Sequence, residues 1–149
     1  MFMKETADIF KLLSDESRMR ILMLLVEKEL CVCQIMGVLN LSQPLISRNL
    51  SLLARAGFLS VRNEGKLTFY RIKSNLAHRP LLALTLLKKL LENDKALRKD
   101  RESLQDCTEF QKKTGACNME TFRAFMEYRK KKKRRGVSDK SPEKIVAHR

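Results

Sequence analysis

The stretch that decides the fold is LSQPLISRNLSLLARAGF, residues 41–58. Ser42 predicts a helix N-cap, and Pro44 falls within the first turn of that helix, where a backbone N–H is not needed. Apolar residues then recur at helical spacing, and Gly57 predicts a left-handed residue that ends the helix. A shorter helix over about 32–40 precedes this one, so the sequence predicts two helices joined by a tight turn.

Further helices precede this pair, and two β-rich segments follow it. Apolar positions predict a helix over 5–13, and Ser14 predicts the N-cap of the strongly apolar helix that comes next. The segments that begin at Phe58 and Leu67 flank residues 63–66 (NEGK), which predicts a β-hairpin. This order predicts a mainly α fold with a small β-hairpin, the winged helix-turn-helix.

Leucine-rich sequence continues beyond the hairpin. From Pro80 to about Leu97 it predicts one long helix, whose apolar arc is wider than a single core face requires. We therefore expect a second protein surface to cover the rest of that arc. The chain divides into a winged-helix and dimerisation domain (1–97), a cysteine-containing extension (98–128) and a basic, mobile tail (129–149).

Positive charge is distributed unevenly along the 149 residues. The chain holds 31 Lys and Arg against 17 Asp and Glu, a net charge of +14, and residues 129–149 hold ten basic and two acidic residues, or +8. The run of seven basic residues at 129–135 either adds phosphate affinity or is a solubilising terminus. The composition excludes collagen and disulfide-dense scaffolds. The first residues lack the order of a signal peptide, and we expect a cytoplasmic protein.

The exposed side of residues 43–55 has the side chains of a helix that reads DNA in the major groove. Gln and Asn pair with adenine, and Arg pairs with guanine or phosphate. Basic residues at the hairpin tip are placed to meet the backbone or the minor groove. Polar residues of this kind are often only a solvated face, but the capped turn before them and the hairpin after them favour DNA. The predicted DNA-binding residues are Gln43, Ser47, Arg48, Asn49, Ser51, Arg62, Asn63 and Lys66.

Two motifs, ELCVCQI at 29–35 and LSQPLISRNLSLL at 41–53, resemble the ArsR/SmtB family of metal-responsive bacterial repressors, in particular its arsenic-repressor branch. The resemblance covers roughly residues 5–92. It implies a winged-helix homodimer, with its interface on the first helix and the leucine-rich helix, that binds double-stranded operator DNA when metal-free and releases it on binding a metalloid. It implies DNA contacts at Gln43, Ser47 and Arg48, whereas Asn49 stands where relatives commonly have His.

Four cysteines are candidate metal ligands, because soft thiolates select As(III), Sb(III), Cd, Pb or Zn. On a regular helix Cys31 and Cys33 would lie about 200° apart, so they converge only if the helix begins between them or its first turn is distorted. The family's arsenic motif is Cys-x-Cys-x-x-Cys, and Met36 stands at its third position. We expect the missing sulfur to come from Cys107 or Cys117, of the same chain or of the dimer mate. With both, four thiolates would also suit Cd, Pb or Zn.

The predicted function is an arsenic-responsive repressor that dissociates from its operator when As(III) or Sb(III) binds cysteine thiolates. The nearest alternative is a repressor of the same fold that responds to Cd, Pb or Zn, or to oxidation of its thiols. A thiol enzyme such as an arsenate reductase would need a phosphate-cradling loop or an activating His or Arg beside the cysteine, and the sequence around Cys31 and Cys33 has neither. We predict no enzyme, no catalytic residue, no permanent cofactor, no membrane contact and no protein partner besides a second copy.

Overall fold

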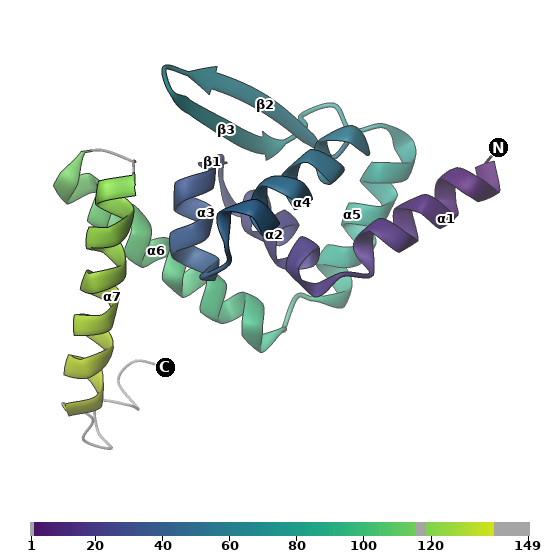
Figure 1. Cartoon of the computed structure of the whole chain (residues 1–149). Coiled ribbons are helices and arrows are strands. Elements are labelled where there is room, and N and C mark those ends of the chain that lie inside the picture. The colour runs from purple at the N-terminus through teal and green to yellow at the C-terminus, as the bar shows by residue number, and fades with distance from the viewer. Residues whose placement is uncertain (1, 116–118, 139–149) are drawn as a thin grey trace.

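A computed structural model gives the structure of the chain and describes residues 2–115 and 119–138. In Figure 1, α1 and α5 lie together at one end of the molecule and α7 stands at the other, beyond α3. No helix in these two ranges is long and apolar enough to cross a membrane. The elements, in chain order, are α1 (Phe2–Leu13), α2 (Glu16–Glu27), β1 (Leu30–Cys31), α3 (Val32–Leu39), α4 (Gln43–Arg55), β2 (Leu59–Glu64), β3 (Leu67–Ile72), α5 (His78–Leu90), α6 (Lys95–Thr114) and α7 (Met119–Ser138).

The pair of helices predicted from residues 41–58 and the helix before them is present. Ser42 is the N-cap of α4, and its Oγ accepts the backbone N–H of Leu45 at 3.4 Å. Gly57 follows the end of α4 with φ +87°, as predicted for a left-handed terminating residue. Gly65 supplies the positive φ (+60°) of the hairpin turn.

One predicted cap is wrong by a residue. Asp15, and not Ser14, is the N-cap of α2, and its carboxylate accepts the backbone N–H of Arg18 at 3.0 Å. This hydrogen bond lowers the pKa of Asp15 below its ordinary value. The Ser14 hydroxyl instead donates to the Lys11 carbonyl at 2.8 Å, which satisfies the end of α1.

The sheet contains a strand that the sequence did not predict. β1 pairs antiparallel with β3, with Leu30 opposite Tyr70 and Cys31 opposite Phe69. β3 pairs in turn with β2, so the strand order is β1-β3-β2. Two residues are too few to show a β pattern, and their pairing is with residues about forty positions away. The strand ties the start of α3 to the hairpin.

The core forms around α2, as its uniformly apolar sequence predicted. Burial of a Leu, Ile or Phe side chain stabilises the folded state by about 1.5–3 kcal/mol, and the fully buried side chains of the core are mostly of these three types. Arg20 on the outer side of α2 donates to both carboxylate oxygens of the buried Asp100 on α6 at 3.0 and 2.9 Å. The fully buried side chains include Ile21, Leu22, Leu30, Ile35, Ile46, Leu50, Leu53 and Phe58.

The predicted leucine-rich helix over 80–97 is two helices. α5 ends at Leu90, and Asp94 caps α6 by accepting the backbone N–H of Leu97 at 3.1 Å. The local hydrogen bond of the Asp94 carboxylate competes with continuation of the first helix. The expected domain boundary after residue 97 therefore falls inside α6.

The basic segment expected to be mobile is helical over residues 129–138, and residues 139–149 lie outside the described ranges. Arg129 of α7 donates to the carbonyl of Gly37 at 2.7 Å and to the Ser103 hydroxyl at 2.8 Å. Lys132 forms an ion pair with Asp106 of α6. These contacts dock α7 onto α3 and α6, and they join residues too far apart in the chain for a sequence pattern to show.

At Gly37, α3 has no side chain between it and the Phe125 ring of α7. A Cβ added there would lie 2.8 Å from Cδ1 of the buried Phe125 ring. Gly37→Ala gains about 0.5–1 kcal/mol of helix propensity but forces the ring away, an overpacking that typically costs about 1–3 kcal/mol. We expect faster hydrogen exchange in α7, measured by mass spectrometry, with exchange in α2 unchanged.

A second substitution separates this packing effect from a general loss of stability. Phe125→Leu removes the ring that an alanine at position 37 would meet. In that background Gly37→Ala should no longer accelerate exchange in α7, as a coupled pair requires. Equal acceleration in both backgrounds contradicts the assignment.

Candidate DNA interface and thiol site

The exposed face of α4 presents most of the residues predicted to contact DNA. Gln43, Arg48 and Ser51 are exposed and Ser47 is half-buried. The opposite face packs Ile46, Leu50 and Leu53 into the core. In Figure 1, α4 lies in front of α2 on the near side of the molecule, beside the hairpin of β2 and β3. α4 and the hairpin thus share one side of the protein.

The structure corrects the position of Asn49. Its side chain is only 3% exposed, on the buried side of α4, and its Nδ2 has no hydrogen-bond partner among the described residues. Asn49 lies three residues after Ile46 and four before Leu53, which places it on the core face of the helix. The interpretation of Asn49 as part of the exposed reading face is therefore wrong, and it reaches no base edge from this position.

The tip of the hairpin is basic, but its arginine is already engaged. Arg62 forms ion pairs with Glu29, at 2.7 Å, and with Glu64, and its guanidinium lies 4.6 Å from the centre of the Phe69 ring. The hydrogen bond from Arg62 lowers the pKa of Glu29. Arg62 therefore exchanges carboxylates for phosphate if it meets DNA, whereas Lys66 is exposed at the turn.

Asn63 is exposed on the same hairpin, and its amide oxygen accepts the hydroxyl of Thr68 across the two strands at 3.0 Å. The amide nitrogen is the group that remains for an acceptor on DNA.

The two neighbouring cysteines lie on different elements. Cys31 is the last residue of β1 and the N-cap of α3, in extended conformation, with φ −93° and ψ 169°. Helix α3 begins at Val32, between the two cysteines, which is the condition under which they can converge. Cys31 is 1% exposed, Cys33 is half-buried, and the backbone N–H of Cys31 donates to Oε1 of Gln34 at 2.8 Å.

Cys107 lies on α6, which packs against α3, and is 4% exposed. Burial raises the pKa of its thiol to about 11, with the positive charge of Lys28 acting in the opposite direction and Cys31 adding to the increase. Gln34 of α3 donates to Oε1 of Gln111 of α6 at 2.7 Å, which brings the start of α3 close to the turn of α6 that follows Cys107. Met36 is buried in the core. Cys117 lies outside the described residues.

These sulfurs do not form a completed metal site in the structure. Over residues 2–115 and 119–138, no three His, Cys, Asp or Glu side chains are grouped closely enough to hold a metal ion. Among the described residues, ligation by Cys31, Cys33 and Cys107 therefore requires a local rearrangement.

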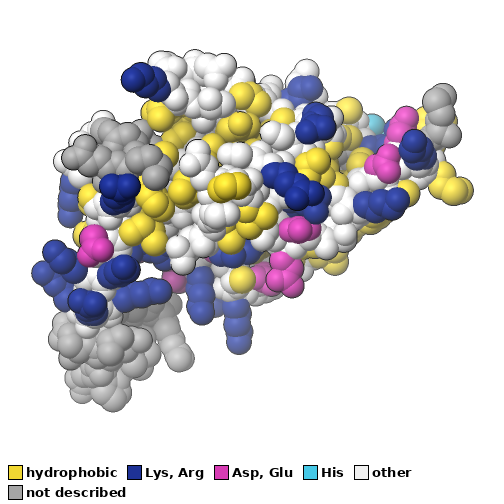
Figure 2. Space-filling model, viewed as in Figure 1, with side chains coloured by type: hydrophobic (Ala, Val, Ile, Leu, Met, Phe, Trp, Pro, Cys, Tyr) yellow, Lys and Arg dark blue, Asp and Glu magenta, His cyan; other side chains and the backbone are white. Residues whose placement is uncertain are grey.

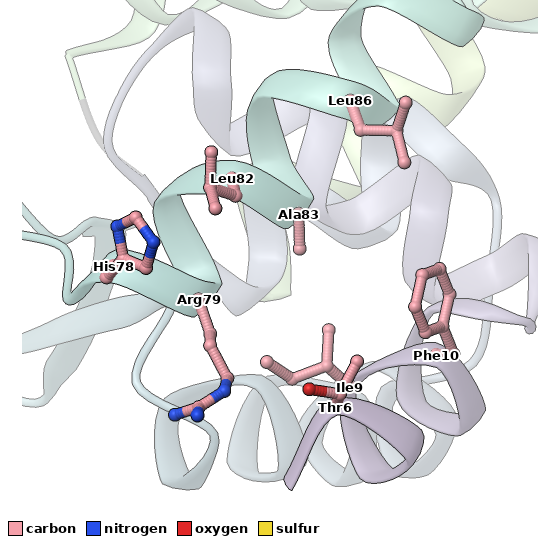
Figure 3. A pocket seen from close by; sticks show the side chains of 8 residues that line it. All are labelled: Thr6, Ile9, Phe10, His78, Arg79, Leu82, Ala83 and Leu86. Carbon is pink, nitrogen blue, oxygen red and sulfur yellow. The ribbon is translucent and has the colours of Figure 1, made fainter. Parts of the chain in front are cut away.

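A hollow of about 330 Å³ between α1 and α5 is lined mainly by apolar side chains (Figure 3). Phe10 is 61% exposed and Leu82 55% exposed at its rim. The sequence signal for this surface was the wide apolar arc of the leucine-rich segment. The residues that line the hollow are Thr6, Ile9, Phe10, His78, Arg79, Leu82, Ala83 and Leu86.

Known proteins with this sequence pattern include bacterial transcriptional regulators. The profile described as "Bacterial regulatory protein, arsR family" matches residues 15–61. The arsenical resistance operon repressor of Escherichia coli (strain K12) is 41% identical over 98 residues, which are 65% of this chain and 76% of that protein. The chain belongs to the arsR family of bacterial regulatory proteins. It is a transcriptional repressor of the ArsR family and not an enzyme.

Other ArsR-family relatives match shorter parts. The arsenic resistance transcriptional regulator ArsR2 of Pseudomonas putida is 47% identical over 46% of this chain and 61% of its own length. The cadmium resistance transcriptional regulatory protein CadC of Listeria innocua is 42% identical over 44% of this chain and 56% of its own length. The transcriptional repressor BigR from Xylella fastidiosa superposes with a TM-score of 0.53 at 28% identity, over 62% of this chain and 89% of BigR.

The burial of Cys107 predicts an order of reactivity among the cysteines. Iodoacetamide attacks thiolates, so at pH 8 the half-buried Cys33 should be alkylated well before Cys107, whose pKa is raised to about 11. The rate at Cys107 should rise about tenfold per pH unit up to its pKa, as its thiolate fraction does. Mass spectrometry of the native protein measures both rates, with urea-unfolded protein as the control. Equal native rates at the two positions contradict the burial of Cys107.

Proposed function

We propose that this metal-responsive repressor is an arsenic sensor, which binds operator DNA when metal-free and leaves it when As(III) or Sb(III) binds Cys31 and Cys33. The observation that carries the proposal is the start of α3 at Val32, between the two cysteines. Cys31 is thereby outside the regular helix and can turn toward Cys33. The arsenic resistance functions in the names of two relatives support the choice of metalloid.

The third sulfur comes from the extension, and the position of Cys107 on α6, one turn before the Gln111 that Gln34 of α3 bonds, makes it the candidate among the described residues. Arsenite takes three thiolates in a pyramid. Each As–S bond forms as one thiol proton and one arsenic-bound hydroxide leave as water, so binding does not require the thiolates to exist beforehand. A protonated, buried thiol such as that of Cys107 is a ligand that joins after the first two.

Metalloid binding at Cys31 and Cys33 would alter DNA binding through both ends of α3. At the start of α3, Cys31 pairs with Phe69 of the hairpin. At the end of α3, Asn40 in a left-handed conformation (φ 55°) leads directly to Ser42, the N-cap of α4. A shift of α3 therefore moves the hairpin and the reading helix relative to each other, and the two no longer fit one DNA site.

A related function, response to Cd, Pb or Zn, is favoured by the CadC relative. Zinc takes four ligands in a tetrahedron, so a tetrahedral site made of sulfur alone needs both Cys107 and Cys117 beside Cys31 and Cys33. The coordination number separates the two functions: X-ray absorption gives three sulfurs for arsenic sensing and four for the tetrahedral ion.

For DNA, we assign the reading role to the exposed face of α4 in the major groove and the flanking role to the hairpin. Gln43, Ser47 and Arg48 lie toward the start of α4, the part of a recognition helix that meets base edges. The remaining assigned contacts are Ser51, Arg62, Asn63 and Lys66.

Arsenite should release the protein from DNA. On a duplex selected by the protein from a random pool, saturating As(III) should weaken binding by about 5–150-fold, the usual range of allosteric coupling. Fluorescence anisotropy measures the affinity. Cys31→Ser and Cys33→Ser should abolish the response, and Met36→Leu, a conservative core change, should leave it intact.

Unchanged DNA affinity at saturating As(III) contradicts arsenic sensing. Cys107→Ser and Cys117→Ser test the third ligand by the same measurement. If neither substitution weakens the response, the third sulfur does not come from the extension.

The apolar surface of α1 and α5 is proposed to bind a second copy of the chain. Phe2, Phe10, Leu82, Leu86 and Leu90 are each between 48% and 74% exposed on these two helices. An exposed cluster of large apolar side chains is typical of an obligate interface. Two identical surfaces of this kind would cover one another about a two-fold axis.

Leu86→Glu should separate the protomers. It removes a leucine from each side of the interface, a loss of about 1.5–3 kcal/mol per copy, and thus weakens dimerisation at least about a hundredfold. Light scattering coupled to size-exclusion chromatography should show a monomer for Leu86→Glu at a concentration where the wild type is a dimer. Val61→Glu, at an equally exposed apolar residue on the hairpin, is the control and should remain dimeric.

A further inference from the structure

Two adjoining hollows lie where α6 and α7 meet the turn between α3 and α4. One, of about 320 Å³, is bordered by Asn40 of the turn, Lys99 of α6, and Lys130 and Lys133 of α7. The other, of about 500 Å³, shares Lys99 and Lys133. We call the surface of Asn40, Lys99, Lys130 and Lys133 the cationic groove. All four side chains are exposed.

Positive charge exceeds negative charge along both hollows, which six basic and three acidic side chains line. The acidic side chains are mostly engaged: Asp100 binds Arg20 at 2.9 Å, and Asp106 pairs with Lys132. Glu102 is the third and is exposed. Asp100 and Asp106 are therefore paired with Arg20 and Lys132, and not with the lysines of the cationic groove.

Two lysines of the groove, Lys130 and Lys133, lie on the docked helix α7. Arg129, between the groove and α3, bonds the Gly37 carbonyl, and the buried Phe125 contacts Gly37 one turn earlier. Lys130 pairs with Glu127 at 3.8 Å, and both side chains are exposed, so the pair contributes little in water. Figure 2 shows Lys and Arg side chains gathered over the part of α7 that lies beyond α3.

The position of the groove relative to the reading helix points to its ligand. In a helix-turn-helix, the first helix crosses the DNA backbone while the second enters the major groove. α3 is that first helix, and Asn40 ends it immediately before α4. Lys99, Lys130 and Lys133 thus lie at the edge of the helix-turn-helix marked by Asn40, where the DNA backbone would pass if α4 entered the major groove.

We propose that the cationic groove binds phosphates of the DNA backbone next to the half-site read by α4. The contact is independent of base sequence and is made by α6 and α7, which lie outside the part of the chain that matches the family profile. The proposal rests on the DNA binding of the family and not on arsenic sensing. Its physical signature is an added salt dependence of affinity, about 0.9 in the slope of log K against log salt for each neutralised phosphate.

The test compares two double variants that lose the same charge. Lys130→Gln with Lys133→Gln changes the groove, and Lys112→Gln with Lys113→Gln changes two exposed lysines at the far end of α6. Anisotropy gives the affinity for a mixed-sequence duplex of about 30 base pairs, without inducer, over a series of salt concentrations. The groove variant should lose about 0.9–1.8 of slope per protomer and the control variant should keep the wild-type slope.

A third variant separates charge from shape. Lys130→Arg with Lys133→Arg keeps both cations and should bind as the wild type does. An equal loss of slope in the groove and control variants, no loss in either, or a loss in the arginine variant as large as in the glutamine variant overturns the proposal. Wild-type binding to the same duplex establishes DNA binding itself, so failure of the groove is distinguishable from failure of the repressor function.

Discussion

The rest of the structure depends on the burial of α3 between the core and the C-terminal helices. Six of its eight residues, from Gln34 to Leu39, are buried. On one side Ile35 belongs to the core around α2, and on the other Gly37 lies against Phe125, with Arg129 bonded to its carbonyl. A short helix with so little intrinsic stability is held by its neighbours, so any displacement of α3 is shared with α4, the hairpin and α7.

The parts of the fold that the sequence predicted are those specified by nearby residues. Ser42 and Gly57 define the ends of α4 because a cap and a left-handed residue act within a few positions. β1 and the docking of α7 depend on pairings across the chain, Cys31 with Phe69 and Arg129 with Gly37. A pattern within a short stretch of sequence does not indicate pairings between residues this far apart. The leucine-rich segment gave a correct helical period but not the break at Asp94, because apolar residues continue on both sides of it.

For the candidate sites the same distinction holds at the level of side chains. The face of α4 follows from helical periodicity for Arg48, yet Asn49, one position later, turns to the core. The engagement of Arg62 by Glu29 joins residues 33 positions apart and could not be read from composition. For the cysteine pair, the two-residue spacing predicted that Cys31 and Cys33 converge if a helix begins between them. The position of that helix start, Val32, came from the structure.

The two proposed ligands act on opposite ends of the same helix. Arsenite would pull on the start of α3 at Cys31, whereas phosphates in the cationic groove would bear on α6 and α7, which hold its C-terminal end at Gly37. Coupling between two ligands is reciprocal, so DNA seated in the groove would make the thiol site harder to close by the same factor by which arsenite weakens DNA binding. Because Arg129 and Phe125 hold α3 at Gly37, we expect the strength of that coupling to depend on these two contacts.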